Sequence, residues 1–198
     1  MPKQVDADRR RSEFVDATWR VITREGLRAV TLRRVAAEAQ CTTGSLTHYF
    51  TSREALLIEA LRAAHHDAAA RIARVVEEIK DDSKRLEAVV LEALPLDGTR
   101  MMEWKTRLAV WAEASASPVL RRENTRRYRQ WSDLLARCLS PIIGRRGDLR
   151  REVVLLTGLV DGLALRMLLH EEGQTGTSKS EAIADLRSYL RRLQGTYR

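Results

Sequence analysis

The sequence predicts an all-α protein of about nine helices, arranged as a small N-terminal domain and a larger C-terminal one. Three observations lead to this fold class. Apolar residues recur at i, i+3, i+4 and i+7 along most of the 198 residues, and no stretch alternates convincingly as a strand. Only 4 Pro and 10 Gly interrupt the pattern. We place the domain boundary between residues 1–52 and 53–198, where short helical repeats give way to a long one.

The N-terminal domain is expected to hold three helices. Apolar residues repeat at helical spacing from about Asp8 to Glu25, and Gly26 is placed to end this helix with a left-handed Schellman stop. Thr31 is a good N-cap for a second, shorter helix. Thr42 or Thr43 can cap a third helix. Two short helices joined by a tight turn therefore follow a longer one.

A long helix is expected to open the second domain. Thr51 and Glu54 match the T-x-x-E capping box, and the apolar repeat after them extends for about 27 residues, to near Asp82. Five further helices are expected at about 84–94, 98–115, 118–139, 149–171 and 180–194. The breaks between them coincide with Pro95, Gly98, Pro118, Pro141, Gly144 and Gly147. Residues 172–179 are rich in Gly, Thr and Ser, and we expect a flexible loop there.

The net charge of +8 and a pI near 10.1 favour polyanionic partners, with nucleic acid first among them. Residues 1–53 carry ten basic and six acidic side chains, so they contribute +4 to this charge. A second basic block, residues 121–151, holds ten Arg and three acids, and we interpret it as a solvated helix face. The charge indicates a class of partner and leaves the fold undecided.

The composition argues against metal, disulfide and membrane chemistry. Cys41 and Cys138 lie 97 positions apart, with no CxxC and no His at metal-ligand spacing, so a reducing cytoplasm fits best. The N-terminal residues lack the apolar core of a signal peptide. The longest apolar run, Val153–Leu169, contains Asp161 and Arg166 and is short for a membrane span. We expect a soluble protein with no metal and no cofactor.

The two short helices have the layout of a helix-turn-helix, in which the second helix enters the major groove and the first crosses the DNA backbone. This function needs small polar side chains on the exposed side of the second helix. Hydroxyl and imidazole groups can bond base edges or phosphates. Such side chains follow the predicted turn: Thr42, Thr43, Ser45, Thr47 and His48.

The stretch from Thr31 to Leu56 resembles the TetR/AcrR family of repressors, and the resemblance extends over residues 8–60. The elements of the family pattern occur in order: a capping Thr, a Val-Ala pair, a Thr-x-Gly turn, a Tyr-Phe ending and Ser-Arg-Glu before a long helix. The resemblance implies repression by occupying an operator, with a ligand shifting the long helix and so changing the separation of two reading heads. We expect the ligand to loosen DNA binding.

The resemblance also implies roles for individual residues. Thr31 is expected to bond a phosphate, and Tyr49 and Arg53 are expected to contact the DNA backbone. Phe50 is expected in the core. The predicted DNA contacts are Thr31, Arg33, Thr42, Thr43, Gly44, Ser45, Thr47, His48, Tyr49 and Arg53.

The chain departs from the family pattern at two positions. Thr47 stands where a Tyr is common, and Gln40 stands in the turn where Gly or a small apolar residue is common. Arg9, Arg10 and Arg11 have two open interpretations. They form either an arm near phosphate or the minor groove, or a solvated helix start.

The C-terminal domain resembles the choline and betaine regulator branch of this family, the BetI type. The similar segments are Trp111–Ala114, Pro118–Arg121, Tyr128–Trp131 and Asp161–Arg166. In such proteins the last two helices pair with their twofold mates in a four-helix bundle. Apolar residues on these helices independently favour a partner protomer: the predicted interface residues are Val153, Leu156, Val160, Leu163, Ile183, Leu186, Leu190 and Leu193. A twofold homodimer implies a pseudo-palindromic operator.

A pocket for a small-molecule effector is expected between the long helix and the helices that follow it. Its candidate lining residues are Met101, Trp104, Leu108, Trp111, Trp131, Leu135 and Met167. Trp104 and Trp111 are seven residues apart and share a helix face. They form either the walls of an aromatic cage for a cation or ordinary core packing, and we favour core packing.

Two other classes of function compete with this interpretation. An enzyme is disfavoured because the sequence has no nucleophile elbow, P-loop, HExxH or dinucleotide fingerprint. A non-specific helical nucleic-acid-binding or architectural protein is favoured by the pI, but opposed by the ordered polar side chains of the turn. The sequence therefore predicts a ligand-responsive repressor that binds double-stranded DNA as a homodimer.

Overall fold

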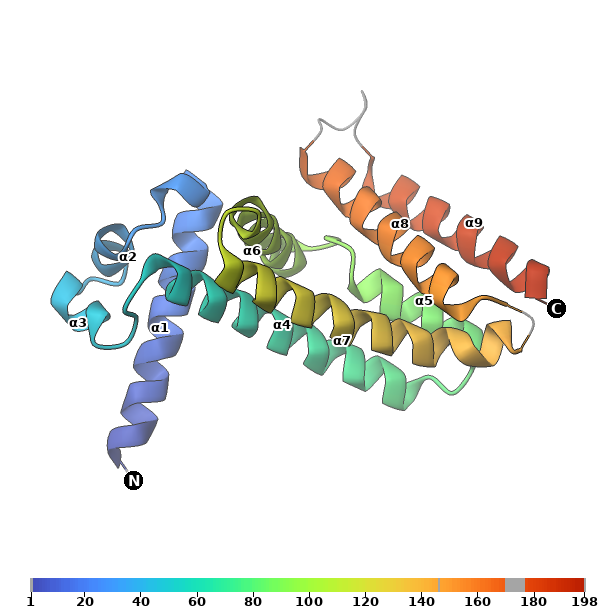
Figure 1. Ribbon diagram of the computed structural model, residues 1–198, viewed down its shortest axis with the longest axis horizontal. Helices are drawn as coiled ribbons and strands as arrows, with labels where there is room; N and C mark the ends of the chain where they lie inside the picture. Colours follow the sequence, from blue (N-terminus) through green and yellow to red (C-terminus); the bar gives the residue numbers. More distant parts are fainter. Residues whose placement is uncertain (1, 146, 170–176, 198) are drawn as a thin grey trace. The chain divides into compact units, whose positions relative to one another are not determined.

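The computed structural model describes residues 2–145, 147–169 and 177–197 (Figure 1). Every regular element in these residues is helical, which confirms the all-α class. The α-helices are α1 (Pro2–Glu25), α2 (Leu32–Glu38), α3 (Thr43–Thr47), α4 (Arg53–Glu78), α5 (Asp82–Glu92), α6 (Gly98–Ala114), α7 (Pro118–Ile143), α8 (Leu149–Leu169) and α9 (Lys179–Tyr197). A 3₁₀ turn, Leu27–Ala29, follows α1. The loop predicted at residues 172–179 falls largely outside the described residues.

The chain forms two compact units whose limits differ from the predicted domains. The first unit combines residues 1–66 with 102–124, and the second combines residues 67–101 with 125–198. The helices α4, α6 and α7 each contribute residues to both units. The limits of these units therefore fall within long helices, and the domain boundary after residue 52 stays a prediction.

The core of the first unit gives the physical reason for this division. Phe14 of α1, Leu46 of α3 and Leu57 of α4 are fully buried in one apolar cluster. Val110 of α6 and Leu120 of α7 are equally buried in the same cluster. Burying an aliphatic or aromatic side chain stabilises a fold by roughly 1.5–3 kcal/mol. The three N-terminal helices thus depend on apolar side chains from far downstream in the sequence.

Gly26 ends α1, but without the predicted Schellman stop. Its φ is 79° and its ψ is 174°, so its backbone is outside the left-handed helical region. Its N–H donates to the Ile22 carbonyl at 3.1 Å. The chain leaves the helix in an extended direction at this glycine, and a 3₁₀ turn begins directly after it, at Leu27.

Two other helix ends also differ from the prediction. The hydroxyl of Ser52, and not that of Thr51, caps α4 by accepting a hydrogen bond from the Ala55 N–H at 3.1 Å. Pro141 does not end α7, which continues beyond it. The proline removes one backbone hydrogen bond, and the helix continues for two more residues, to Ile143. The helix then ends at Gly144, whose φ of 61° turns the chain away.

The second unit packs α9 against both α8 and α5. Arg187 of α9 bonds to Glu87 of α5, with 2.7 Å between Nε and Oε1. Most of the predicted interface residues lie in the core of this unit: Val153, Leu156, Val160, Leu163, Leu186, Leu190 and Leu193 are buried, and Ile183 is partly buried. Packing within this unit, which includes the contacts of α9 with α8 and α5, covers these apolar seams. These residues are thus largely buried within one chain, and their part in an interface between two chains stays a prediction.

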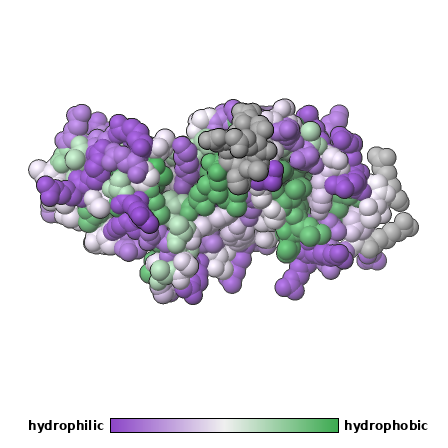
Figure 2. Space-filling model, turned by 90° about the horizontal axis from the view of Figure 1, so that it is seen from above, coloured by the Kyte–Doolittle hydropathy of each residue, from purple (hydrophilic) through white to green (hydrophobic). Residues whose placement is uncertain are grey.

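The outer side of α8 is apolar as well. Val154, Leu155 and Leu169 are 65%, 47% and 58% exposed. Gly158 and Gly162 follow Val154 by one and two helical turns and are also exposed. Figure 2 shows that apolar surface gathers in patches between polar ones on the face in view. None of the described helices combines the length and apolarity that a membrane crossing needs.

Candidate DNA-binding surface

The turn between α2 and α3 is fixed by two backbone hydrogen bonds. The Cys41 N–H donates to the Ala36 carbonyl at 2.9 Å, and the Gln40 N–H donates to the Ala37 carbonyl at 3.1 Å. This pair of bonds defines a Schellman stop. Gln40 adopts the left-handed conformation with a φ of 54°, which costs a residue with a Cβ about 1–2 kcal/mol. The motif expected at Gly26 is thus found at Gln40, where the family more often has a smaller residue.

Threonine hydroxyls cap both helices of the pair. The Thr31 hydroxyl accepts from the Arg34 N–H, and the Thr42 hydroxyl accepts from the Ser45 N–H, each at 3.1 Å. Both bonds confirm the predicted caps. A hydroxyl that accepts through a lone pair keeps its O–H as a donor, so each cap can still donate to a phosphate oxygen.

The outer side of α3 carries the predicted reading residues. Those exposed to solvent are Thr42, Thr43, Gly44, Thr47 and His48, with Ser45 partly exposed. The Thr47 hydroxyl donates to the Gly44 carbonyl at 2.9 Å, so it is turned back onto its own helix. Within the described residues, the side chains of Thr43 and His48 make no hydrogen bond to the protein. These two side chains are therefore available to the edges of bases.

Aromatic packing holds α3 against α1. The ring of Tyr49 lies 5.4 Å from that of Phe14, tilted by 58°, and Phe50 meets Phe14 edge to face at 6.2 Å. Phe50 is buried, as predicted, and Tyr49 is partly exposed. Such ring pairs contribute roughly 0.5–1.5 kcal/mol beyond their buried area. The rings anchor the end of α3 and leave its polar side outward.

Three arginines converge on Glu38 in the last turn of α2. Arg20 lies 2.9 Å and Arg34 lies 3.2 Å from its carboxylate oxygens, and Arg24 also pairs with it. Arg34 further donates to Glu25 at 2.9 Å. The hydrogen bond from Arg20 is the main reason that the pKa of Glu38 is lowered. This network connects α2 to α1. It pairs three of the basic side chains whose charge favoured a polyanionic partner with acidic groups of the protein itself.

Comparison with known families identifies this arrangement. Residues 14–60, which include α2 and α3, match the bacterial regulatory proteins of the tetR family. Residues 82–195, more than half of the chain, match the C-terminal domain of BetI-type transcriptional repressors. The chain belongs to the TetR family. It is a helix-turn-helix transcriptional regulator that binds DNA, as the resemblance implied.

Full-length relatives support the assignment to the TetR family. The regulator BetI of Burkholderia cenocepacia is 37% identical over 172 residues, which cover 84% of this chain and 86% of BetI. The regulator PksA of Bacillus subtilis is 31% identical over 180 residues, covering 85% of this chain and 83% of PksA. A transcriptional regulator of Saccharomonospora viridis, solved in complex with choline, superposes with a TM-score of 0.80 at 25% identity, covering 93% of this chain and 95% of its own.

Arg53 of this TetR-family chain is engaged inside the first unit. Its Nε donates to the Val30 carbonyl at 2.8 Å, and its Nη2 donates to the Leu27 carbonyl at 3.2 Å. Its Nη1 lies 3.1 Å from a carboxylate oxygen of Glu113. Most of the N–H donors that the guanidinium would offer to a phosphate are thus already bonded to protein groups. The phosphate contact predicted for Arg53 competes with these internal bonds.

The three arginines near the N-terminus of the TetR-family chain lie within α1 and form no separate arm. Arg10 lies 2.6 Å from a carboxylate oxygen of Glu13, one helical turn away. The guanidinium of Arg11 lies 5.6 Å from the centre of the Phe50 ring. Residues 9–11 therefore occupy the surface of a helix, which favours the second of the two interpretations.

The predicted effector-pocket residues of the first unit are packed together. The rings of Trp104 and Trp111 meet edge to face at 5.9 Å, and the guanidinium of Arg107 lies 4.3 Å from the centre of the Trp104 ring. The Trp111 indole N–H donates to Asn124 at 2.9 Å. Trp104 is only 2% exposed, whereas Leu108 is partly exposed. One face of Trp104 already holds a cationic side chain, so core packing describes this indole better than an open cage wall.

The other predicted pocket residues belong to the second unit: Met101, Trp131, Leu135 and Met167. Leu135 is fully buried, and the other three are partly exposed. On the same helices, the Tyr128 hydroxyl of α7 donates to a carboxylate oxygen of Asp161 in α8 at 2.6 Å. The effector pocket as a whole stays a prediction.

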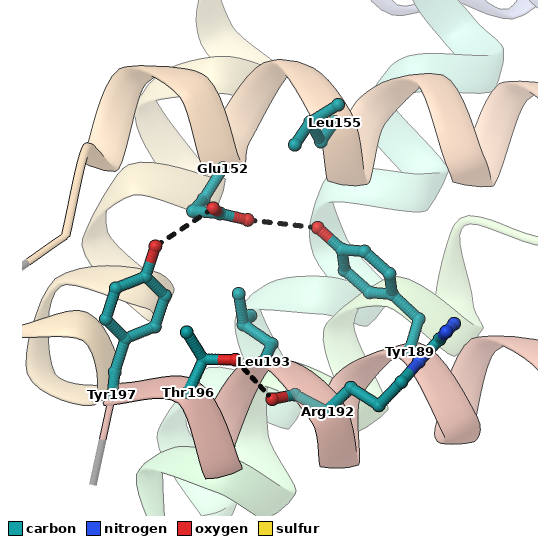
Figure 3. Close-up of a pocket in the computed structure, with 7 residues that line it drawn as sticks. All are labelled: Glu152, Leu155, Tyr189, Arg192, Leu193, Thr196 and Tyr197. Atoms are coloured by element: carbon teal, nitrogen blue, oxygen red, sulfur yellow. Dashed lines mark hydrogen bonds between the residues drawn. The ribbon is translucent and has the colours of Figure 1, made fainter.

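A groove of about 340 Å³ lies between α8 and α9 (Figure 3). Glu152 accepts hydrogen bonds from the hydroxyls of Tyr189 at 3.1 Å and Tyr197 at 3.0 Å, one on each side of it. Burial, followed by the Glu152 carboxylate, raises the pKa of Tyr189 to about 12. The remaining lining residues are Leu155, Arg192, Leu193 and Thr196. The groove thus shares Leu155 with the apolar outer side of α8.

Sequence reasoning missed the internal roles of the charged residues. Arg34 and Glu38 are four positions apart on one helix, and this spacing alone indicates an ion pair. Arg53 and Glu113 are 60 positions apart, so no local pattern connects them. Only the packing of α6 into the first unit brings their side chains together.

Proposed function

We propose that this regulator is a cytoplasmic, homodimeric repressor that occupies a pseudo-palindromic DNA site and leaves it when a small-molecule effector binds. The observation that carries the proposal is the exposed polar side of α3, which follows a turn fixed by caps and backbone hydrogen bonds. In this proposal, Thr43, Ser45 and His48 read base edges. Arg33, which is exposed on α2, and Tyr49 contact the DNA backbone.

The outer side of α8 supports the homodimer. Val154, Leu155 and Leu169 present apolar surface that a second copy would remove from water. A Cβ added at Gly158 or Gly162 would meet nothing within 4 Å, so the backbone of a partner helix can approach closely there. A twofold axis beside α8 brings the same surface from both protomers together. Two reading heads related by that axis require two inverted half-sites in the DNA.

Choline is the effector to test first, because a solved relative of similar length carries it. The packed Trp104 and the Arg107 guanidinium over its ring argue that a cation would not bind on that face of the indole. A ligand changes operator affinity only if it binds the free and DNA-bound states unequally. The proposal therefore requires choline, if it is the effector, to bind the DNA-free state more tightly.

The proposed function is tested by selecting duplexes from a random library with the purified protein. We expect two inverted half-sites about one helical turn apart, bound about a thousandfold more tightly than random duplex. Choline added to the complex is expected to weaken binding, with imidazole as the control compound. Selected duplexes without a shared sequence would favour a non-specific nucleic-acid-binding protein instead. Tighter binding on addition of choline would contradict release by this effector.

A further inference from the structure

The guanidinium of Arg53 connects three elements of the first unit. Arg53 is the first residue of α4, and it bonds to the Val30 carbonyl at 2.8 Å and the Leu27 carbonyl at 3.2 Å. Its two terminal nitrogens lie 3.1 Å and 3.3 Å from the two carboxylate oxygens of Glu113, in the last turn of α6. The two side chains are 27% and 35% exposed, so water screens this pair only in part.

These contacts fix the backbone that leads into the reading helices. Leu27 and Val30 precede Thr31, the N-cap of α2, by four positions and one position. A planar guanidinium has donors on more than one edge, so it can bind carbonyls and a carboxylate at the same time. A movement of Glu113 would therefore act on the same group that holds the entry to α2.

The last turn of α6 is also built into the core of the first unit. Val110 and Ala114 flank Glu113 in this stretch and belong to the apolar cluster of Phe14 and Leu46. The same helix begins at Gly98, and its first four residues, 98–101, belong to the second unit. The helix that carries Glu113 is thus continuous with residues of the second unit.

We propose that Arg53 and Glu113 are a positioning pair, through which α6 sets the orientation of α2 and α3. The pair acts without touching DNA, in contrast to the phosphate contact that the family resemblance implied for Arg53. It rests on the proposed function only in that DNA binding is used to detect it. We call the exposed polar side of α3, with the caps of α2 and α3, the reading surface. A shift of α6 would change the orientation of this surface through the pair.

The test compares Arg53→Gln, Glu113→Gln and the double variant, each titrated with the selected duplex over a series of salt concentrations. The matched control is Glu59→Gln, because Glu59 pairs with Arg62 at 3.7 Å on the surface of α4 in the same unit. A positioning pair predicts that each single variant weakens binding about tenfold and that the double variant is no weaker than either single one. The slope of log affinity against log salt should stay unchanged, since no phosphate contact is lost. The control should bind as the unaltered protein does.

A phosphate contact predicts a different pattern. Arg53→Gln alone would then weaken binding and reduce the salt slope by about 0.9, and Glu113→Gln would leave affinity unchanged or higher. That result would overturn the proposal.

Amide hydrogen exchange of the free protein gives a second, independent readout. Residues 27–34 should exchange faster in Glu113→Gln than in Glu59→Gln, and equal rates would contradict the positioning role. This measurement decides the matter even if Arg53→Gln does not fold. It also needs no DNA, so a failure of the proposed function and a failure of the positioning pair are distinguishable.

Discussion

The reading surface and the α8–α9 helix pair differ in how directly the sequence determines them. At the reading surface, the caps made by Thr31 and Thr42 act on residues three positions away, so the chemistry is local. In α8, apolar residues occupy both sides of the helix, and only the fold decides that Leu156 is buried while Leu155 stays 47% exposed. Polar capping patterns can therefore be assigned from sequence, whereas the role of an apolar face depends on what covers it.

The largest expected effect is a difference in the free energy of unfolding between substitutions on the two sides of α8. Leu156→Ala should lower the free energy of unfolding by about 2–5 kcal/mol, because it leaves a cavity in the core of the second unit. Leu155→Ala, its matched control on the outer side, should lower the unfolding free energy of the dissociated chain far less. Denaturant titrations at several protein concentrations measure both. Equal losses would show that the inner and outer sides have been assigned wrongly.

A bulky residue on the outer side tests the contact between protomers. Gly158→Leu meets open space in the single chain, so the helix should keep its stability. In the dimer the added side chain should force the helices apart at a cost of about 1–3 kcal/mol, which raises the dissociation constant roughly tenfold to a hundredfold. Sedimentation equilibrium measures this constant. An unchanged dimer would place the interface elsewhere.

Substitutions at the reading surface should separate specificity from affinity. Ser45→Ala or His48→Ala should cost about 1–3 kcal/mol on the selected site and little on random duplex, because base contacts are lost. Tyr49→Ala should weaken binding to all duplexes alike, since its predicted contact is to the DNA backbone. Competition binding measures the loss of affinity for the selected duplex and for random duplex. If the ratio of these two losses were the same for all three variants, the assigned roles would be wrong.

A smaller effect is expected at the turn between α2 and α3. Gln40→Gly should raise the free energy of unfolding by about 1 kcal/mol, because glycine adopts a φ of 54° without strain. Gln40→Ala keeps the Cβ and serves as the control, with no gain expected. Thermal unfolding compares the three proteins. A destabilised glycine variant would mean that the Gln40 side chain contributes more than its backbone strain costs.

The smallest expected effect is a pH dependence in the α8–α9 groove. The pKa of Tyr189 is raised to about 12, so its neutral form is favoured in the folded protein. The stability that this contributes is present below pH 10 and is lost as the pH rises from about 10 through 12. The difference in unfolding free energy between the unaltered protein and Tyr189→Phe should shrink across that range. A constant difference would show that the folded state does not raise the pKa of Tyr189.

Local signals accounted for most of the reading surface and for the helix order. The caps at Thr31 and Thr42 and the exposure of His48 follow from residues within a few positions, whereas the burial of Phe50 was implied by the family resemblance. The role of Arg53 did not follow, because its carboxylate partner lies 60 positions away. The limits of the units did not follow either, since they depend on the burial of Val110 and other downstream residues beside the N-terminal helices.

The predicted dimer residues show a further limit of sequence reasoning. The seam that includes Leu186 and Leu190 has the helical spacing of an interface, and the same spacing is produced by a helix that packs within its own chain. Helical periodicity indicates that a face is covered, but it does not show whether the same chain or a second copy covers it.

In the proposed complex, two chains joined along the outer side of α8 present two α3 helices to one DNA site. Native mass spectrometry of the protein with its selected duplex counts the bound chains. We expect two chains on a duplex with two inverted half-sites, and a loss of most of the affinity when one half-site is scrambled. A single bound chain, or equal affinity for the intact and scrambled duplexes, would contradict it.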